Sequence, residues 1–76
     1  MASHYLTVEQ AAERLHLSRW TIRDKARRRQ LPHRKPPGTR RLLFPVADLE
    51  AFEDGAELEY RKWGRDGRIV TVKQRP

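Results

Sequence analysis

The chain has 76 residues, a formal net charge of +7 and no cysteine. A chain of this length forms one domain with a small core, because it buries only about 60% of the surface that its unfolded form exposes. The composition excludes disulfides and thiolate metal sites, and no apolar run reaches the length that spans a membrane.

The charge falls in blocks along the sequence. Residues 14–44 carry eleven Lys or Arg against one acid, whereas residues 45–60 hold six acids and no base. Residues 61–76 return to six bases against one acid. Because basic surfaces bind nucleic acids, anionic membranes and acidic proteins alike, the position of the first basic block matters more than the total charge.

Residues 6–22 have the spacing of two short helices that meet at a tight turn. Thr7 is placed to cap the first helix with Gln10 as the other half of a capping box, and Ser18 is placed to cap the second. Between the caps, apolar residues repeat at helical spacing: Val8, Ala11, Ala12 and Leu15. The pattern predicts a helix-turn-helix, and the basic block begins on its second helix.

Three arginines, Arg19, Arg23 and Arg27, share one face of this second helix, with Ile22 and Ala26 on the other side. The first turn of a recognition helix enters the major groove of DNA, where side chains reach base edges. The candidate recognition-helix contacts are Ser18, Arg19, Trp20, Thr21, Arg23, Lys25, Arg27 and Arg28. Among them, base reading is assigned to Arg19, Trp20, Thr21 and Arg23, and phosphate contact to Lys25, Arg27 and Arg28. The alternatives are a merely solvated face for the arginines and a core position for Trp20.

After Leu31 and Pro32, which stop the helix, the sequence predicts a two-stranded hairpin, or wing. Residues 36–38 supply turn chemistry, and residues 42–44 alternate as a strand does. The candidate DNA contacts on the wing are Arg34, Lys35, Thr39, Arg40 and Arg41. Guanidinium groups in such a place reach backbone phosphates or a neighbouring minor groove. The alternative is a disordered basic loop, which would still add electrostatic affinity.

Residues 45–52 predict a third helix, with Pro45 near its start and acids in its early turns. Gly55 is expected to end or bend it, and residues 56–63 to add a further helical turn or two. These acids are read as a solvated face turned away from DNA. Nothing in the segment supplies a catalytic pair.

The C-terminal part begins with a turn at residues 64–67. Residues 68–73 are rich in β-branched side chains and predict a strand with no partner nearby in sequence. We expect strand pairing between two copies, through the oligomerisation residues Ile69, Val70, Thr71 and Val72. The alternatives are pairing with the wing or with another protein, and a frayed terminus.

Several segments together resemble the compact winged helix-turn-helix of the MerR superfamily, in the stand-alone form typical of excisionases. They are residues 5–12, 17–22, 31–32, 40–41 and 44–52. The resemblance implies an α+β fold: a DNA-binding domain over residues 5–54 with a short two-stranded wing and a third helix, followed by a C-terminal β-strand extension over residues 55–76. Arg29 stands where a helix-ending glycine is common, and Lys25 and Ala26 replace larger apolar residues. The second helix is therefore expected to run longer or pack more loosely than in the family.

The resemblance also implies a function. Excisionases are recombination directionality factors of bacteriophages: they bind repeated sites in double-stranded DNA beside an attachment site, bend the DNA, and help a tyrosine integrase to excise. We expect the protein to act as a homodimer or as an array on DNA, with copies that associate through the C-terminal strand. It has no catalytic residue, cofactor or metal, and no membrane partner. Because residues 1–5 lack the basic and apolar regions of a signal peptide, we expect it in the bacterial cytoplasm.

Two other functions remain open at this stage. A small transcriptional regulator could share the fold, although an effector domain or a long dimerising helix would be expected, and residues 56–76 are too short for either. A small enzyme or nuclease is the third alternative. It is disfavoured because His4, His16 and His33 lack the spacing of metal ligands.

Overall fold

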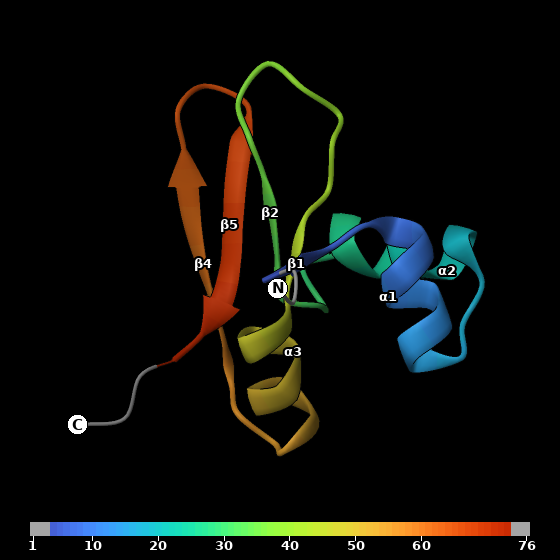
Figure 1. Cartoon of the computed structure of the whole chain (residues 1–76). Helices are drawn as coiled ribbons and strands as arrows, with labels where there is room; N and C mark the ends of the chain where they lie inside the picture. The colour runs from blue at the N-terminus through green and yellow to red at the C-terminus, as the bar shows by residue number, and fades with distance from the viewer. Residues whose placement is uncertain (1–3, 74–76) are drawn as a thin grey trace.

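The structure, a computed structural model, describes residues 4–73 as a three-stranded sheet beside a pair of helices (Figure 1). In chain order the elements are β1 (Tyr5–Leu6), α1 (Val8–Leu15), α2 (Arg19–Arg27), β2 (His33–Lys35), β3 (Phe44–Pro45), α3 (Val46–Glu53), β4 (Leu58–Trp63) and β5 (Gly67–Val72). Helices α1 and α2 lie together on one side, and α3 lies at one end of the sheet. The α+β class is confirmed. None of the helices in residues 4–73 is long and apolar enough to cross a membrane.

The starts of α1 and α2 form as their cap residues predict. The Thr7 hydroxyl accepts a hydrogen bond from the Gln10 amide at 3.2 Å, and the Thr7 amide donates to the Gln10 side chain at 2.9 Å. The Ser18 hydroxyl accepts from the Thr21 amide at 3.0 Å. These bonds satisfy amide groups that have no partner within their own helix.

Both helices end through a residue in the left-handed conformation. His16 has φ 58° after α1, and Arg29 has φ 60° after α2. The Leu17 amide then donates to the Ala12 carbonyl at 3.0 Å, and the Gln30 amide to the Lys25 carbonyl at 2.8 Å. This is the hydrogen-bonding pattern that usually needs glycine. The expectation that α2 runs longer without a glycine is wrong, because Arg29 adopts the glycine conformation itself.

The core lies between the helix pair and the strands that follow it. Ala11 of α1 and both Ile22 and Ala26 of α2 are fully buried, as are Phe44 of β3 and Leu49 of α3. The small side chain of Ala26 thus sits in the core, and α2 does not pack loosely against its neighbours. The short strand β1 pairs with β3, with Leu6 opposite Phe44, and this pairing joins the N-terminal segment to the core.

The three-stranded sheet has the order β2, β5, β4, and all its pairs are antiparallel. Here the expectation of further helix over residues 56–63 is wrong. Gly55, at φ 95°, turns the chain out of α3, and Leu58–Trp63 forms strand β4 instead. The expected turn over residues 64–67 is confirmed, and it makes β4 and β5 a hairpin. Pairing with β5 over six residues overrides the local helical tendency of the segment.

Strand β5 occupies the middle of this sheet. Val70 pairs with His33 of β2 on one side and with Tyr60 of β4 on the other. The expected pairing between copies through Ile69, Val70, Thr71 and Val72 is therefore wrong, because both edges of the strand already have partners in the same chain. Val70 is 1% exposed.

The wing is less regular than the sequence predicts. Only Arg34 and Leu43 pair across it, with mutual backbone hydrogen bonds of 2.8 and 2.9 Å. Phe44 pairs with Leu6 of β1, and β2 pairs along its length with β5. We call residues 36–42 the wing loop.

Candidate DNA interface

The exposed face of α2 carries most of the candidate recognition residues. Ile22 and Ala26 hold the other face in the core, so the side chains of Arg19, Arg23 and Arg27 project outward. Trp20, in the first turn, is 71% exposed. The alternative reading of Trp20 as a core residue is wrong, and its indole is free to meet a ligand.

Acidic partners already balance part of this positive face. Arg19 pairs with Glu9 of α1 at 3.0 Å, and Asp24 pairs with Arg27 at 2.7 Å and with Arg28 at 3.2 Å. The hydrogen bond from Arg27 keeps the pKa of Asp24 below its ordinary value, and Arg28 adds to the effect. Arg23, by contrast, makes no ion pair or side-chain hydrogen bond with any residue in 4–73. Its guanidinium is the one on this face that is most available to an external anion.

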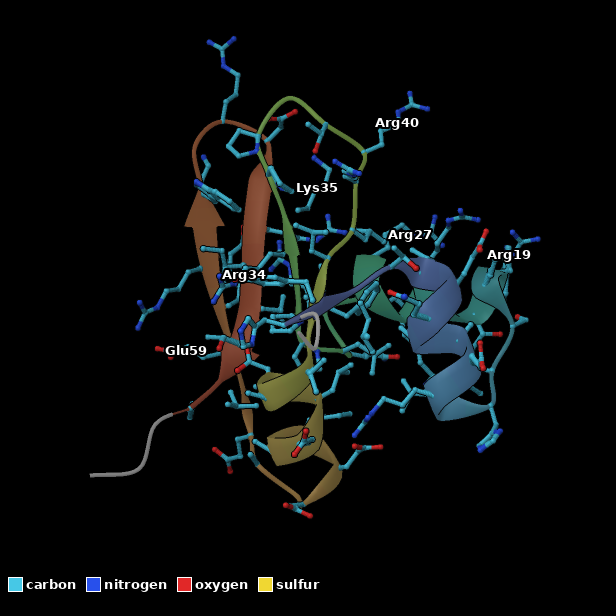
Figure 2. All side chains as sticks on the ribbon, in the orientation of Figure 1. Arg19, Arg27, Arg34, Lys35, Arg40 and Glu59 are labelled. Carbon is cyan, nitrogen blue, oxygen red and sulfur yellow. The ribbon has the colours of Figure 1, made fainter. Side chains whose placement is uncertain are left out.

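A cleft of about 700 Å³ separates the start of α1 and the outer face of α2 from the wing. We call it the basic cleft; it is lined by Thr7, Val8, Glu9, Arg23, Arg27, Lys35, Arg40, Arg41, Leu42, Leu43 and Arg68. Figure 2 shows Arg19 and Arg27 on α2 and Arg40 on the wing loop projecting from the same side of the molecule. The cleft therefore brings together recognition-helix and wing residues that lie far apart in the sequence.

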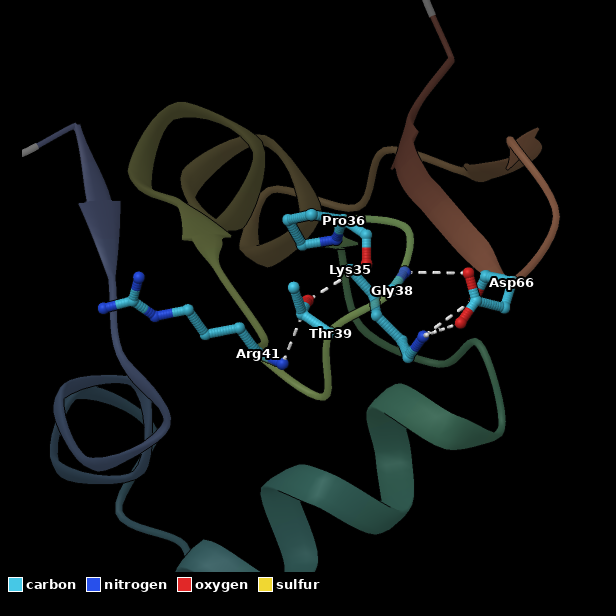
Figure 3. Close-up of polar contacts among 6 residues, drawn as sticks. All are labelled: Lys35, Pro36, Gly38, Thr39, Arg41 and Asp66. Atoms are coloured by element: carbon cyan, nitrogen blue, oxygen red, sulfur yellow. Dashed lines mark hydrogen bonds and ion pairs between the residues drawn. The ribbon is translucent and has the colours of Figure 1, made fainter.

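Hydrogen bonds of Thr39 fix part of the wing loop (Figure 3). The Thr39 hydroxyl donates to the Pro36 carbonyl at 3.0 Å and accepts from the Arg41 amide at 3.4 Å. Thr39 thus has a structural contact within the loop. The side chains of Arg40 and Arg41 make no hydrogen bond or ion pair within residues 4–73, and both line the basic cleft.

The two other wing candidates face different ways, because neighbouring residues of a strand alternate between its faces. Lys35 lines the cleft but is largely covered, and its ammonium donates to the Asp66 carbonyl at 2.8 Å. Arg34 lies on the other face, where its guanidinium donates to the Tyr5 hydroxyl at 2.7 Å and lies 5.4 Å from the ring centre. The structure does not bring Arg34 to the basic cleft.

One cleft residue, Arg68, was missed by the sequence reasoning. It stands on β5 opposite Lys35, and its Nε donates to Nε2 of His33 at 2.8 Å. His33 is fully buried, and its Nδ1 lies 2.7 Å from the Leu31 carbonyl. Burial lowers the pKa of His33, with Arg68 adding to the effect, so the ring is neutral at pH 7 and accepts the Arg68 hydrogen bond. Alternation along β5, with Val70 and Val72 buried, was the signal that could have placed Arg68 on the same face.

The elements that surround the basic cleft define a class of protein. Two capped helices cross at a tight turn, the second presents a basic face, and a wing lies across the cleft from it, as in winged helix-turn-helix DNA-binding domains. A family model described as a helix-turn-helix domain matches residues 5–55. The chain belongs to this helix-turn-helix family, and DNA is its partner. No curated protein and no solved structure matches the chain.

Proposed function

We propose that the protein is an excisionase of the MerR-like type: a DNA-bending factor, without catalytic activity, that directs a tyrosine integrase towards excision of a bacteriophage genome in the bacterial cytoplasm. The observation that carries the proposal is the basic cleft, where Arg23 of α2 faces Arg40 and Arg41 of the wing loop. All three guanidinium groups lack acidic partners within residues 4–73.

This arrangement suits DNA bending. With α2 and Arg23 in the major groove, the wing cations Arg40 and Arg41 neutralise phosphates at a separate point on the same side of the duplex. Curving a site of 20–30 base pairs costs about 1–6 kcal/mol, which contacts from several bound copies can offset. A regulator of the same fold would use the same surface but would not need repeated sites or a bend.

We propose further that copies on adjacent sites associate through β4. Its outer edge has no backbone partner among residues 4–73, since β5 occupies only the inner edge. Antiparallel pairing of two β4 strands centred on Tyr60 would set Glu59 of each copy opposite Arg61 of the other. Opposite charges at directly opposed positions stabilise strand pairs, and like charges destabilise them.

The charge swap tests this association. Sedimentation on a DNA with adjacent sites should show lost cooperativity for Arg61→Glu and its recovery in the Glu59→Arg, Arg61→Glu double variant. If both variants bind as cooperatively as the unaltered protein, association through β4 is wrong.

The proposed function itself is tested by a circular-permutation mobility-shift assay on DNA that flanks the gene and any nearby attachment site. We expect stepwise complexes on repeated sites, with a mobility that depends on the position of the site in the fragment. A single unbent complex over a promoter would instead identify a transcriptional regulator. Addition of the integrase should then yield excised product only with a protein that retains Arg23 and Arg40.

A further inference from the structure

The turn between β4 and β5 docks against the wing loop (Figure 3). The Gly38 amide in the loop donates to a carboxylate oxygen of Asp66 in the turn at 2.9 Å. From the start of the loop, the Lys35 ammonium donates to the Asp66 carbonyl at 2.8 Å and lies 3.9 Å from its other carboxylate oxygen. Asp66 of the C-terminal hairpin thus contacts both Lys35, just before the wing loop, and Gly38 within it.

The two backbones also approach closely at this point. A Cβ atom at Gly67 would lie 2.5 Å from the Trp63 carbonyl oxygen and 2.8 Å from the Lys35 carbonyl oxygen, distances that no side chain tolerates. A Cβ at Gly64 would lie 3.0 Å from the ring of Pro37. The wing loop and the hairpin turn therefore form one tip, although the turn lies outside the residues that match the family. Figure 1 shows the two loops reaching the same end of the molecule.

Some charged side chains at this tip have partners within the protein and others do not. Lys35 and Asp66 compensate each other, and the Asp66 carboxylate faces the loop. Arg65, the neighbour of Asp66, is exposed and makes no hydrogen bond or ion pair with any residue in 4–73. Arg40 and Arg41 on the loop are free in the same sense. The tip thus presents available guanidinium groups from two segments of the chain.

We propose that the β4–β5 hairpin is a second limb of the wing: Arg65 contacts a phosphate of the duplex that Arg40 and Arg41 contact, and Asp66 is the positioning residue that orders the wing loop for binding. This inference rests on the proposed DNA interface. It adds a contact that the helix-turn-helix segment alone does not contain.

The Arg65 contact is tested by the salt dependence of DNA binding, measured by fluorescence anisotropy with Arg65→Ala, Arg40→Ala and Lys73→Ala. Lys73 is the control, because it is an exposed cation of the same hairpin that pairs with Glu57 beyond the far end of β5. Loss of one phosphate contact lowers the slope of log affinity against log salt by about 0.9, equivalent to about eightfold in affinity at 0.1 M salt. We expect this loss for Arg65→Ala and a much smaller one for Lys73→Ala.

The outcomes separate this inference from the proposed interface. If Arg40→Ala weakens binding while Arg65→Ala behaves like Lys73→Ala, the second limb is wrong and the interface stands. If neither Arg40→Ala nor Arg65→Ala changes the affinity, the wing as a whole is not part of the DNA interface.

The role of Asp66 is tested by the sign of its effect. Removing an acid from a DNA-binding surface should strengthen binding by electrostatics alone. If Asp66 orders the loop, loss of the hydrogen bond from the Gly38 amide should instead lower the DNA affinity of Asp66→Ala about threefold or more. It should also speed hydrogen exchange at the Gly38 amide. Asp66→Asn, which keeps an oxygen acceptor, should bind at least as tightly as the unaltered protein, and Asp54→Ala controls for the lost charge. Binding of Asp66→Ala as tight as that of Asp54→Ala would overturn the positioning role.

Discussion

Arg23 and Arg40 lie on opposite sides of the basic cleft and should contribute to DNA binding in different ways. Arg23 projects from the recognition helix, so Arg23→Ala should remove a base contact. A two-point hydrogen bond to guanine provides about 1–3 kcal/mol of discrimination, which is about 5- to 150-fold in the preference for the specific site. Arg40 stands on the wing loop, so Arg40→Ala should weaken specific and random DNA equally.

The structure indicates that both substitutions leave the fold intact. Neither side chain has an acidic partner within residues 4–73, so neither deletion leaves an unpaired carboxylate, and each should change stability by less than about 0.5 kcal/mol. Arg14→Ala controls for the loss of one positive charge away from the interface, because Arg14 lies on α1, pairs with Glu53 and does not line the cleft.

Affinities for a selected site and for random duplex, each measured over a range of salt concentrations, give the required comparison. The unaltered protein should show a slope of log affinity against log salt of roughly −4 to −5, as about five phosphate contacts would produce. Arg40→Ala should reduce that slope by about 0.9 on both DNAs. Equal losses on specific and random DNA for Arg23→Ala would refute base reading by this residue.

Four further predictions concern the stability of the fold that carries this surface. His16→Gly should raise the free energy of unfolding by about 1 kcal/mol in urea titrations, because glycine adopts φ 58° without strain, and a loss of stability would contradict this. Arg29→Gly should raise the free energy of unfolding by less, because it also removes the guanidinium that lies 3.8 Å from the centre of the Tyr60 ring. In a Tyr60→Ala background, His16→Gly and Arg29→Gly should have similar effects. Burial lowers the pKa of His33 below 6.5, so the unfolded chain takes up a proton at a higher pH than the folded protein. The contribution of His33 to stability should be full above pH 6.5 and be lost as the pH falls through the folded-state pKa. A urea midpoint that is the same at about pH 7.5 and about pH 5 would disprove this pH dependence. Gly67→Ala should destabilise the β4–β5 hairpin by more than 1 kcal/mol, whereas an unchanged thermal midpoint would show that the tip is looser than the close backbone contacts imply.

The helix pair could be predicted from the sequence because its signals are local. Thr7, Gln10 and Ser18 cap their helices through residues no more than three positions away, and the buried faces follow from helical spacing. The end of α2 was harder, since Arg29 adopts a conformation in which glycine is expected. A non-glycine residue gives no local sign that the helix stops there.

The sheet could not be predicted in the same way, because its partners are distant. Strand β5 pairs with β2 across more than thirty residues, as in His33 with Val70. Residues 56–63 look helical in isolation and become β4 only when β5 lies beside them. The same dependence hid part of the site. Alternation along the strands separates the faces of Arg34 and Lys35 and groups Arg68 with Val70, but only the pairing of β5 with β2 brings Arg68 beside Lys35 in the basic cleft.

The central claim is that DNA lies against the outer face of α2 and the wing tip. It is tested most directly by an NMR titration of the isotope-labelled protein with a duplex selected for binding. We expect amide shifts to concentrate at residues 18–28, 35–41 and 64–66, with α3 and the outer edge of β4 unchanged by a duplex that carries a single site. Shifts concentrated on α3 or on the sheet face around Arg34, with the basic cleft unaffected, would contradict it.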